Sequence, residues 1–300
     1  MNTKVIIAGV TFNNPIMTAS GTFGSGAEYS DFVNLNRLGA VVTKGVANVP
    51  WEGNPTPRVQ ETYGGMLNAI GLQNPGIDVF IERDIPFLKQ YDTRMIVNVC
   101  GRSVSDYVEV VEKLADQPVD MLEINVSCPN VKHGGIAFGQ DPKCLFDITK
   151  EIKAKAKQPI IMKLSPNVTD ITEMAKAAEA AGSDALSLIN TITGMKIDIH
   201  KRTFALANKT GGLSGPAIKP VAVRMVYQVA NAVKIPIIGM GGIACAEDAI
   251  EFLLAGATGV AIGAMNFVNP YTTIEVIKGI EEYMRQYDIK DLTQIIGTVK

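Results

Sequence analysis

The sequence predicts an α/β protein of the (β/α)8 or TIM barrel class, with inserted loops over the carboxyl-terminal face of the barrel. Short apolar runs recur along the chain and are typical of buried parallel strands, and helical segments lie between them. The length of 300 residues, 47% of them hydrophobic, fits one barrel, so we expect residues 1–300 to form a single domain. An open, doubly wound sheet is the alternative architecture, since periodicity does not show closure.

Strands are predicted where an apolar run ends in a polar residue or a glycine. Seven are visible, at residues 40–44, 94–99, 120–125, 159–164, 184–189, 235–239 and 259–263. We expect the eighth strand in the irregular stretch from Phe204 to Gly215. A glycine precedes three of the strands, and Gly39, Gly182 and Gly256 each fit the left-handed position that closes a helix.

Helices are predicted in the intervals between these strands. Residues 105–115 place Val108, Val111 and Leu114 at helical spacing. Two further helices have the spacing of a capping box at their start, formed by Asp170 with Glu173 and by Thr272 with Glu275. We expect the apolar faces of all three helices to pack into the core.

Two insertions break the regular alternation of strands and helices. Residues 46–93 are rich in glycine, proline and asparagine and far exceed an ordinary strand-to-helix connection, so we expect them to cover the site. Residues 127–139 contain three glycines and resemble a mobile lid.

Composition narrows the class of protein further. A formal net charge of −2 provides no basic field that would attract nucleic acid or an anionic membrane. The first ten residues are too weakly basic for a signal peptide, and no run approaches the roughly 18 apolar residues of a membrane span. The 4 cysteines lack C-x-x-C spacing, and neither His133 nor His200 has a partner at metal-ligand spacing. We therefore expect a cytoplasmic protein with no metal site of its own.

Polar residues stand at the downstream ends of five predicted strands, namely Lys44, Asn98, Asn125, Lys163 and Asn190. Enzymes built on parallel sheets place their chemistry at these carboxyl ends. Lysines and asparagines converging there would bind a flat, polar and anionic ligand. The alternative for each lysine is a surface side chain that extends into solvent, and a Schiff-base role for Lys163 is also chemically possible.

Glycines follow the last two predicted strands, at Gly239, Gly241, Gly242 and Gly263. In barrel enzymes this position commonly forms a phosphate site, because bare backbone N–H groups can reach the oxygens. The alternative interpretation is that the glycines only permit tight turns. No G-x-G-x-x-G motif follows the first strand, which argues against a dinucleotide site of the Rossmann type.

Cys128 lies just past a strand end, in a loop that Pro129 stiffens. Cysteine commonly acts as a small hydrophobic residue in a protein core. A thiol at the mouth of a barrel can instead act as a general base when its surroundings favour the thiolate.

Three motifs together resemble class 1 dihydroorotate dehydrogenase. They are NVSCPNVK at residues 125–132, NAIGLQNPG at 68–76 and GGLSGP at 211–216, and the resemblance extends from Asn14 to Pro270. Within that family, the first motif and the GGIAFG run at 134–139 resemble the catalytic subunit of the NAD-linked subgroup. Cysteine at position 128, where the membrane-associated class has serine, agrees with this assignment.

The resemblance implies an FMN-binding barrel that oxidises dihydroorotate to orotate in pyrimidine biosynthesis, with one FMN in each chain. Cys128 would take the C5 proton while hydride passes from C6 to N5 of the flavin. Substrate binding would involve Lys44, Asn68, Ala69, Ile70, Gly71, Leu72, Asn125, Asn190 and Thr191. FMN binding would involve Ser20, Lys44, Gly45, Asn98, Asn125, Lys163, Ile189, Gly215, Gly241, Gly242, Gly263 and Ala264.

The path by which electrons leave is a separate question, since the chain shows no second cofactor motif. The NAD-linked subgroup implies a homodimeric core that binds a subunit carrying FAD and [2Fe-2S], in a heterotetramer, and we favour this reading. A homodimer that reduces fumarate is the alternative within the family. More remote alternatives are a phosphate-sugar isomerase or aldolase that uses Lys163 as an imine former, and a non-catalytic interaction subunit.

Overall fold

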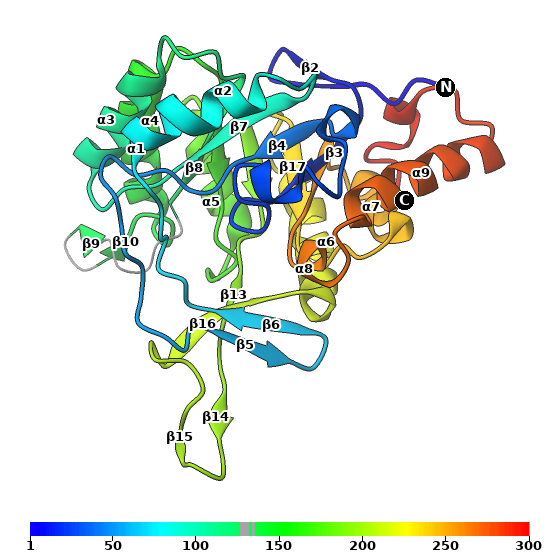
Figure 1. The fold of residues 1–300 in the computed structure, drawn as a ribbon. Coiled ribbons are helices and arrows are strands. Elements are labelled where there is room, and N and C mark those ends of the chain that lie inside the picture. The colour runs from blue at the N-terminus through cyan, green and yellow to red at the C-terminus, as the bar shows by residue number, and fades with distance from the viewer. Residues whose placement is uncertain (127–131, 134–135, 300) are drawn as a thin grey trace.

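The computed structural model describes residues 1–126, 132–133 and 136–299 and contains a closed barrel of parallel strands (Figure 1). Each strand pairs with the next along the chain, and the last pairs with the first. The barrel strands are β3 (Ile16–Thr18), β4 (Ala40–Val42), β7 (Arg94–Val99), β8 (Met121–Asn125), β11 (Ile160–Lys163), β12 (Ala185–Leu188), β17 (Ile237–Met240) and β18 (Gly259–Ile262). The predicted (β/α)8 barrel is therefore confirmed.

The position of the eighth strand differs from the prediction. It is β3, near the amino terminus, and it closes the barrel between β18 and β4. The stretch 204–215 instead contains β16 (Thr210–Ser214), whose five residues are all half-buried. It pairs antiparallel with β6 (Gly65–Asn68) and β13 (Ile192–Met195). Two consecutive glycines leave β16 without the apolar side chains that a buried barrel strand needs.

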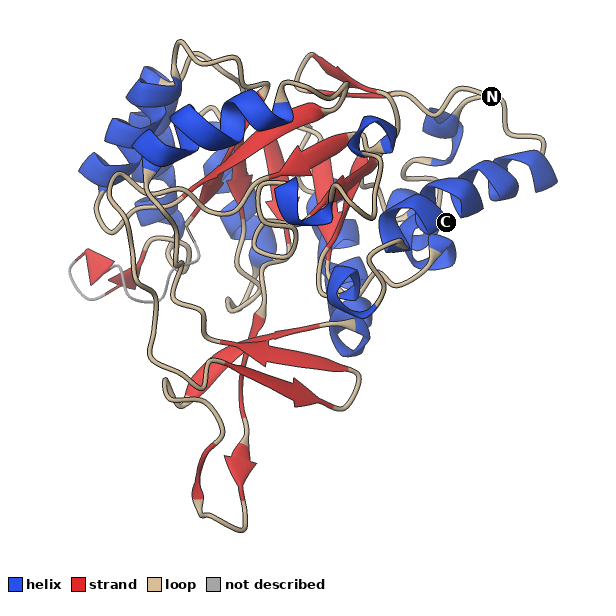
Figure 2. Ribbon diagram, viewed as in Figure 1, coloured by secondary structure: helices blue, strands red, loops and turns tan. Residues whose placement is uncertain are grey.

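Helices surround the barrel on its outside, as Figure 2 shows. The main ones are α3 (Val104–Leu114), α4 (Pro142–Lys155), α5 (Ile171–Ala180), α6 (Lys219–Ala230), α7 (Ala246–Leu254) and α9 (Thr272–Gln286). Shorter segments are α1 (Ile77–Val79), η3 (Phe80–Asp84), α2 (Ile85–Leu88), α8 (Met265–Val268) and the 3-10 turns η1 (Ala27–Tyr29), η2 (Leu35–Arg37), η4 (Pro216–Ile218) and η5 (Leu292–Ile295). Their apolar faces and both faces of the strands form one continuous core.

The helix starts follow the sequence signals only in part. Asp170 caps α5 by accepting a hydrogen bond from the Thr172 N–H, although Glu173 does not complete a capping box. The box predicted at Thr272 is wrong, because α9 begins after Tyr271 without a side-chain cap. Glu275 instead accepts a hydrogen bond from the Asn269 side chain.

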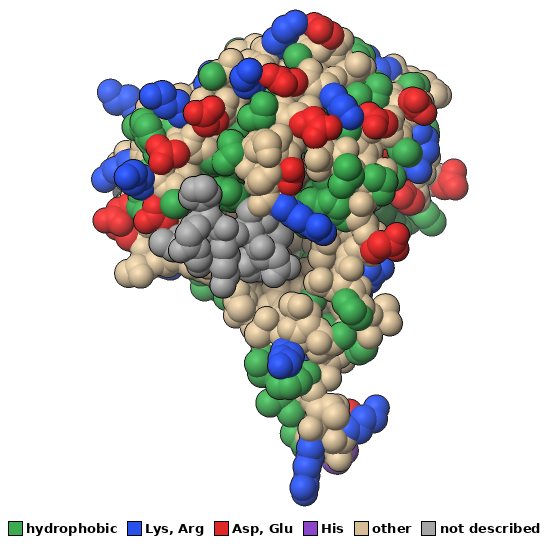
Figure 3. Space-filling view, turned by 90° about the vertical axis from the view of Figure 1, so that its left-hand side faces the viewer, with side chains coloured by type: hydrophobic (Ala, Val, Ile, Leu, Met, Phe, Trp, Pro, Cys, Tyr) green, Lys and Arg blue, Asp and Glu red, His purple; other side chains and the backbone are tan. Residues whose placement is uncertain are grey.

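A small antiparallel sheet extends from the end of the barrel at which the strands finish (Figure 1). Its strand order is β13-β16-β6-β5, with β5 at Val59–Thr62. The hairpin of β14 (Ile197–Asp198) and β15 (Thr203–Phe204) extends beyond it, and Figure 3 shows this arm from the side with basic side chains at its end. The short pair β9 (Lys132–His133) and β10 (Ile136–Ala137) lies near this end of the barrel, and the hairpin of β1 (Val5–Ile7) and β2 (Val10–Phe12) lies near the opposite end.

Gly39 occupies a different role from the predicted helix-closing position. Gly182 and Gly256 do have positive φ values, of +96° and +114°. Gly39 does not, but a Cβ atom there would lie 2.1 Å from the backbone oxygen of Asn14 and 2.9 Å from that of Ile16. Glycine is required at this position because the backbones of β3 and β4 approach too closely for any side chain.

Replacing Gly39 with alanine is therefore expected to lower the free energy of unfolding by about 3 kcal/mol, the upper part of the range for overpacking. Gly182→Ala is the matched control, since its Cβ would meet only Lys153 Cγ at 3.4 Å, an ordinary contact. The control should lose about 1 kcal/mol, through its positive φ alone. Urea denaturation with a common m-value measures both, and equal losses would contradict the steric explanation.

No helix in the described part of the chain is long and apolar enough to cross a membrane.

Candidate active site

A cavity of about 430 Å³ lies between the carboxyl ends of the barrel strands and the antiparallel sheet. That volume is within the usual range for ligand pockets. The insertion predicted to cover the site does so, because Asn54, Val59 and Met66 line the cavity together with residues 68–72. One face of the cavity thus comes from the barrel and the other from the inserted segments.

Nearly all the candidate residues chosen from the sequence meet in this cavity. Those that line it are Ser20, Lys44, Gly45, Asn68, Ala69, Ile70, Gly71, Leu72, Asn125, Lys163, Ile189, Asn190, Thr191, Gly215, Gly241, Gly242, Gly263 and Ala264. Asn98 is fully buried beneath it, close to Gly45. Cys128 lies outside the described residues, as does most of the lid predicted at 127–139.

Two lysines place positive charge on the barrel side of the cavity. Lys44 lies two residues after the end of β4, and Lys163 is the last residue of β11. Burial lowers the pKa of the Lys44 ammonium below its ordinary value, Cys100 opposes this shift, and the charges of Arg58 and Lys163 reinforce it. A bound anion would offset the free-energy cost of burying the Lys44 ammonium near other positive charges. The lysine pair therefore favours a negatively charged ligand.

Carboxamides lie beside the lysines and are held in fixed orientations. Asn190 donates from Nδ2 to Asn125 Oδ1 over 3.3 Å, and its own Oδ1 accepts the Thr191 N–H at 2.8 Å. Asn125 ends β8, where its backbone oxygen accepts the Tyr107 hydroxyl at 2.7 Å. Asn68, on the opposite face of the cavity, donates to the Gly212 carbonyl at 3.4 Å. The site therefore offers both amide donors and amide acceptors to a planar ligand.

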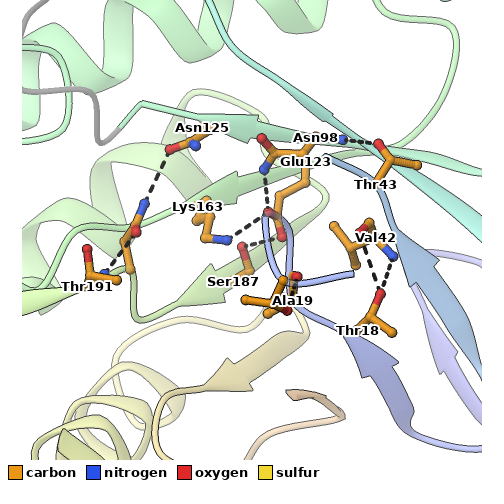
Figure 4. A network of polar contacts seen from close by, with 12 residues as sticks. Thr18, Ala19, Val42, Thr43, Asn98, Glu123, Asn125, Lys163, Ser187 and Thr191 are labelled. Atoms are coloured by element: carbon orange, nitrogen blue, oxygen red, sulfur yellow. Dashed lines mark hydrogen bonds and ion pairs between the residues drawn. The ribbon is translucent and has the colours of Figure 1, made fainter. Parts of the chain in front are cut away.

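A buried carboxylate that was not among the predicted site residues lies under the barrel side of the cavity. Glu123 accepts hydrogen bonds from Asn98, Lys163 and Ser187, and Figure 4 shows these side chains converging from neighbouring strands. The nearby Thr18 hydroxyl bonds the backbone of Val42 between β3 and β4. The available signal for Glu123 is its position, since it is a charged residue inside an apolar run. A carboxylate buried in such a strand needs hydrogen-bond partners around it.

Glycine loops form the end of the cavity near β17 and β18. Gly215, Gly241 and Gly242 have φ values of +103°, +126° and +80°. A Cβ atom at Gly242 would lie 2.8 Å from the backbone nitrogen of Lys219, and one at Gly241 would lie 2.9 Å from Ala222 Cβ. Packing against these neighbours excludes a side chain at both positions, and Gly215, Gly241 and Gly242 all line the cavity, so backbone N–H groups there are available to phosphate oxygens.

Other polar residues that line the cavity were not among the predicted ones. Ser165 and Asn167 follow β11, and Asn167 Nδ2 donates to the Thr191 carbonyl at 3.0 Å. Thr193 and Ser214 reach the cavity from the antiparallel sheet. The Ser-Pro-Asn run at residues 165–167, just beyond the end of β11, is a signal that could have identified the first two.

Comparison with known proteins decides the family. The family model for dihydroorotate dehydrogenase matches residues 2–284. The chain belongs to the dihydroorotate dehydrogenase family. The resemblance seen in the three motifs is thus confirmed, and with it the assignment to the oxidoreductases.

Curated relatives match over the full length of the chain. One from Lachnoclostridium phytofermentans is 73% identical, with 100% of both chains covered. Others come from Thermoanaerobacter pseudethanolicus, at 57% identity over 100% of this chain and 99% of the relative, and from Geobacter metallireducens, at 56% over 99% and 98%. All three are named as the catalytic subunit of dihydroorotate dehydrogenase B (NAD(+)).

Proposed function

We propose that this protein oxidises dihydroorotate to orotate with one FMN in the cavity, as the catalytic subunit of an NAD-linked dihydroorotate dehydrogenase. The observation that carries the proposal is the convergence of Lys44, Lys163, Asn125 and Asn190 on one cavity at the carboxyl ends of the barrel strands. Family membership and the printed names of relatives that match over the full length support the choice of substrate and acceptor.

The described residues fit FMN in three respects. The glycine loops at Gly241, Gly242 and Gly263 suit its phosphate, since no side chain stands between backbone and cavity. Lys163 supplies a cation for the edge of the ring on which negative charge develops. Asn98 Oδ1 is buried without a hydrogen-bond partner among the described residues and lies 3.0 Å from the Cβ position of Gly45, so a donor at the cavity floor would satisfy it.

The remaining polar groups suit dihydroorotate, a cyclic imide with one carboxylate. Lys44 would neutralise the carboxylate, and the amides of Asn68, Asn125 and Asn190 would pair with the ring's N–H and C=O groups. The segment from Ala69 to Leu72 would close over the ligand. When bound, FMN supplies a two-electron acceptor for the hydride that leaves C6 of the substrate.

Cys128 is the proposed general base. Its sulfur would take the C5 proton as the electrons of that C–H bond form the new double bond and the hydride leaves C6. In the sequence it stands three residues after Asn125, and Asn125 is the last residue of β8. The proton would then pass from the thiol to water. A partner subunit that carries FAD and [2Fe-2S] would accept the two electrons, and we expect it in a heterotetramer built on a homodimeric core.

Two measurements test this function. The purified protein should be yellow, and anaerobic dihydroorotate should bleach it. Coexpression with the partner from the same source should add the FAD and iron–sulfur absorption and confer NAD reduction. Colourless protein that takes up no added FMN would overturn the proposal, and rapid reoxidation by fumarate with no partner bound would replace the NAD-linked assignment by the fumarate-using one.

Asn190→Ala is expected to weaken orotate binding about tenfold while FMN stays bound. The variant loses one hydrogen bond to the ligand, and it also loses the contact between the Asn190 and Asn125 side chains. Together these losses should cost about 1.4 kcal/mol of binding free energy. Asn231→Ala, at the end of α6 and outside the cavity, is the control. Titration of the flavin absorption with orotate measures both, and equal affinity in the two variants would remove Asn190 from the substrate site.

A further inference from the structure

A buried carboxylate, Glu123, lies behind the cavity and has no part in the chemistry proposed above. It occupies the middle of β8, two residues before Asn125, so strand alternation directs both side chains to the barrel interior. Its exposed fraction is 1%, and it is not among the residues that line the cavity. A group so placed acts on a bound ligand only through its neighbours or through its charge.

Three strands besides β8 supply hydrogen bonds to this carboxylate. Asn98, which stands opposite Glu123 in the β7–β8 register, donates from Nδ2 to Oε1 at 2.6 Å. Lys163 of β11 donates to the same oxygen at 3.1 Å, and Ser187 of β12 donates to Oε2 at 3.2 Å. An amide, an ammonium and a hydroxyl thus supply the hydrogen bonds and the opposite charge that a buried carboxylate needs. Glu123 therefore carries a negative charge at the centre of four adjacent strands (Figure 4).

Lys163 connects this carboxylate to the cavity. Its ammonium has three N–H donors, and Glu123 is the acceptor that the described residues offer to one of them. The other two remain for a ligand in the cavity, which Lys163 lines. Because the pair is buried, with side-chain exposures of 6% and 1%, water screens neither charge well. A ligand at the floor thus experiences the lysine charge partly offset by the carboxylate behind it.

We propose that Glu123 is a positioning residue that holds the Lys163 ammonium at the cavity floor and, by offsetting its charge, lowers the reduction potential of the bound FMN. The inference rests on the proposed function, since it takes FMN as the ligand. Reduced FMN carries more negative charge than oxidised FMN, so it gains more from a nearby cation. Removing the carboxylate leaves that cation uncompensated, which favours the reduced form. A low potential, in turn, lets electrons leave for the next acceptor.

The test is the midpoint potential of FMN in the Glu123→Gln variant, an almost isosteric change. In this variant the ratio of the affinity for reduced FMN to that for oxidised FMN should rise tenfold to a hundredfold. For a two-electron couple, this corresponds to a midpoint potential that is higher by about 30 to 60 mV. Glu109→Gln is the control, because it changes the net charge equally on α3, where the side chain is 47% exposed. Its potential should equal that of the unmodified protein. A Glu123→Gln potential at or below the unmodified value would overturn the inference.

A second comparison covers the case in which Glu123→Gln does not fold. The double variant Lys163→Ala/Glu123→Gln removes both charges, and its potential at saturating FMN should exceed that of Lys163→Ala by a similar ratio. Equal potentials in these two variants would count against Glu123. Failure of the proposed function would appear differently, as an unmodified protein that binds no FMN at all.

Discussion

Replacing Cys128 with alanine is expected to leave FMN bound and to slow its anaerobic bleaching by dihydroorotate about 10²- to 10⁴-fold at neutral pH, the range that general base catalysis contributes. The variant keeps the cavity and both lysines, so ligand binding should survive while the acceptor for the C5 proton is lost. Stopped-flow absorbance of the flavin measures the rate directly and is independent of any partner subunit.

Cys245→Ala is the matched control for this variant. Cys245 is exposed at the start of α7 and is not among the residues that line the cavity, so its removal should leave the bleaching rate unchanged. Cys128→Ser adds a test of the chemistry, since a hydroxyl is a far weaker acid than a thiol. We expect the serine variant to recover part of the rate as the pH rises. Bleaching of Cys128→Ala at the unmodified rate would remove this residue as the base.

The site could be predicted from local pattern because a parallel barrel brings all strand ends to one rim. A polar residue that ends an apolar run must lie there, and Lys44, Asn125, Lys163 and Asn190 all line the cavity. That inference needs no knowledge of which strands are neighbours. It therefore does not depend on the order of strands in the sheet.

Features that depend on contacts between distant segments could not be predicted in this way. Glu123 lies within an apolar run, and only the β7–β8 register brings Asn98 opposite to it. The strand β3 is three residues long, and it becomes recognisable only through its pairing with β4 and β18. Gly39 is explained by the approach of β3, which no local signal indicates. In each case the local sequence does not show which strands lie side by side in the barrel.

Lys163→Ala is expected to have the largest effect on the protein as a whole. It removes the cation from a buried pair and leaves the Glu123 carboxylate uncompensated, which should lower the free energy of unfolding of the apoprotein by about 3–5 kcal/mol. FMN retention should fall as well, because the variant loses the ammonium that lines the cavity. Urea denaturation of the apoprotein and titration with FMN measure the two effects separately.

Two further variants show whether the stability lost in Lys163→Ala comes from leaving a charge buried without a partner. Lys157→Ala breaks the Lys157–Asp116 pair, whose side chains are 64% and 85% exposed, and should cost under about 1 kcal/mol. Adding Glu123→Gln to Lys163→Ala should restore part of the lost stability, because the uncompensated carboxylate is then gone. FMN affinity should not recover, since the ammonium is still missing. A double variant as unstable as Lys163→Ala would show that the cost lies in lost packing of the lysine side chain instead of in the charge it leaves behind.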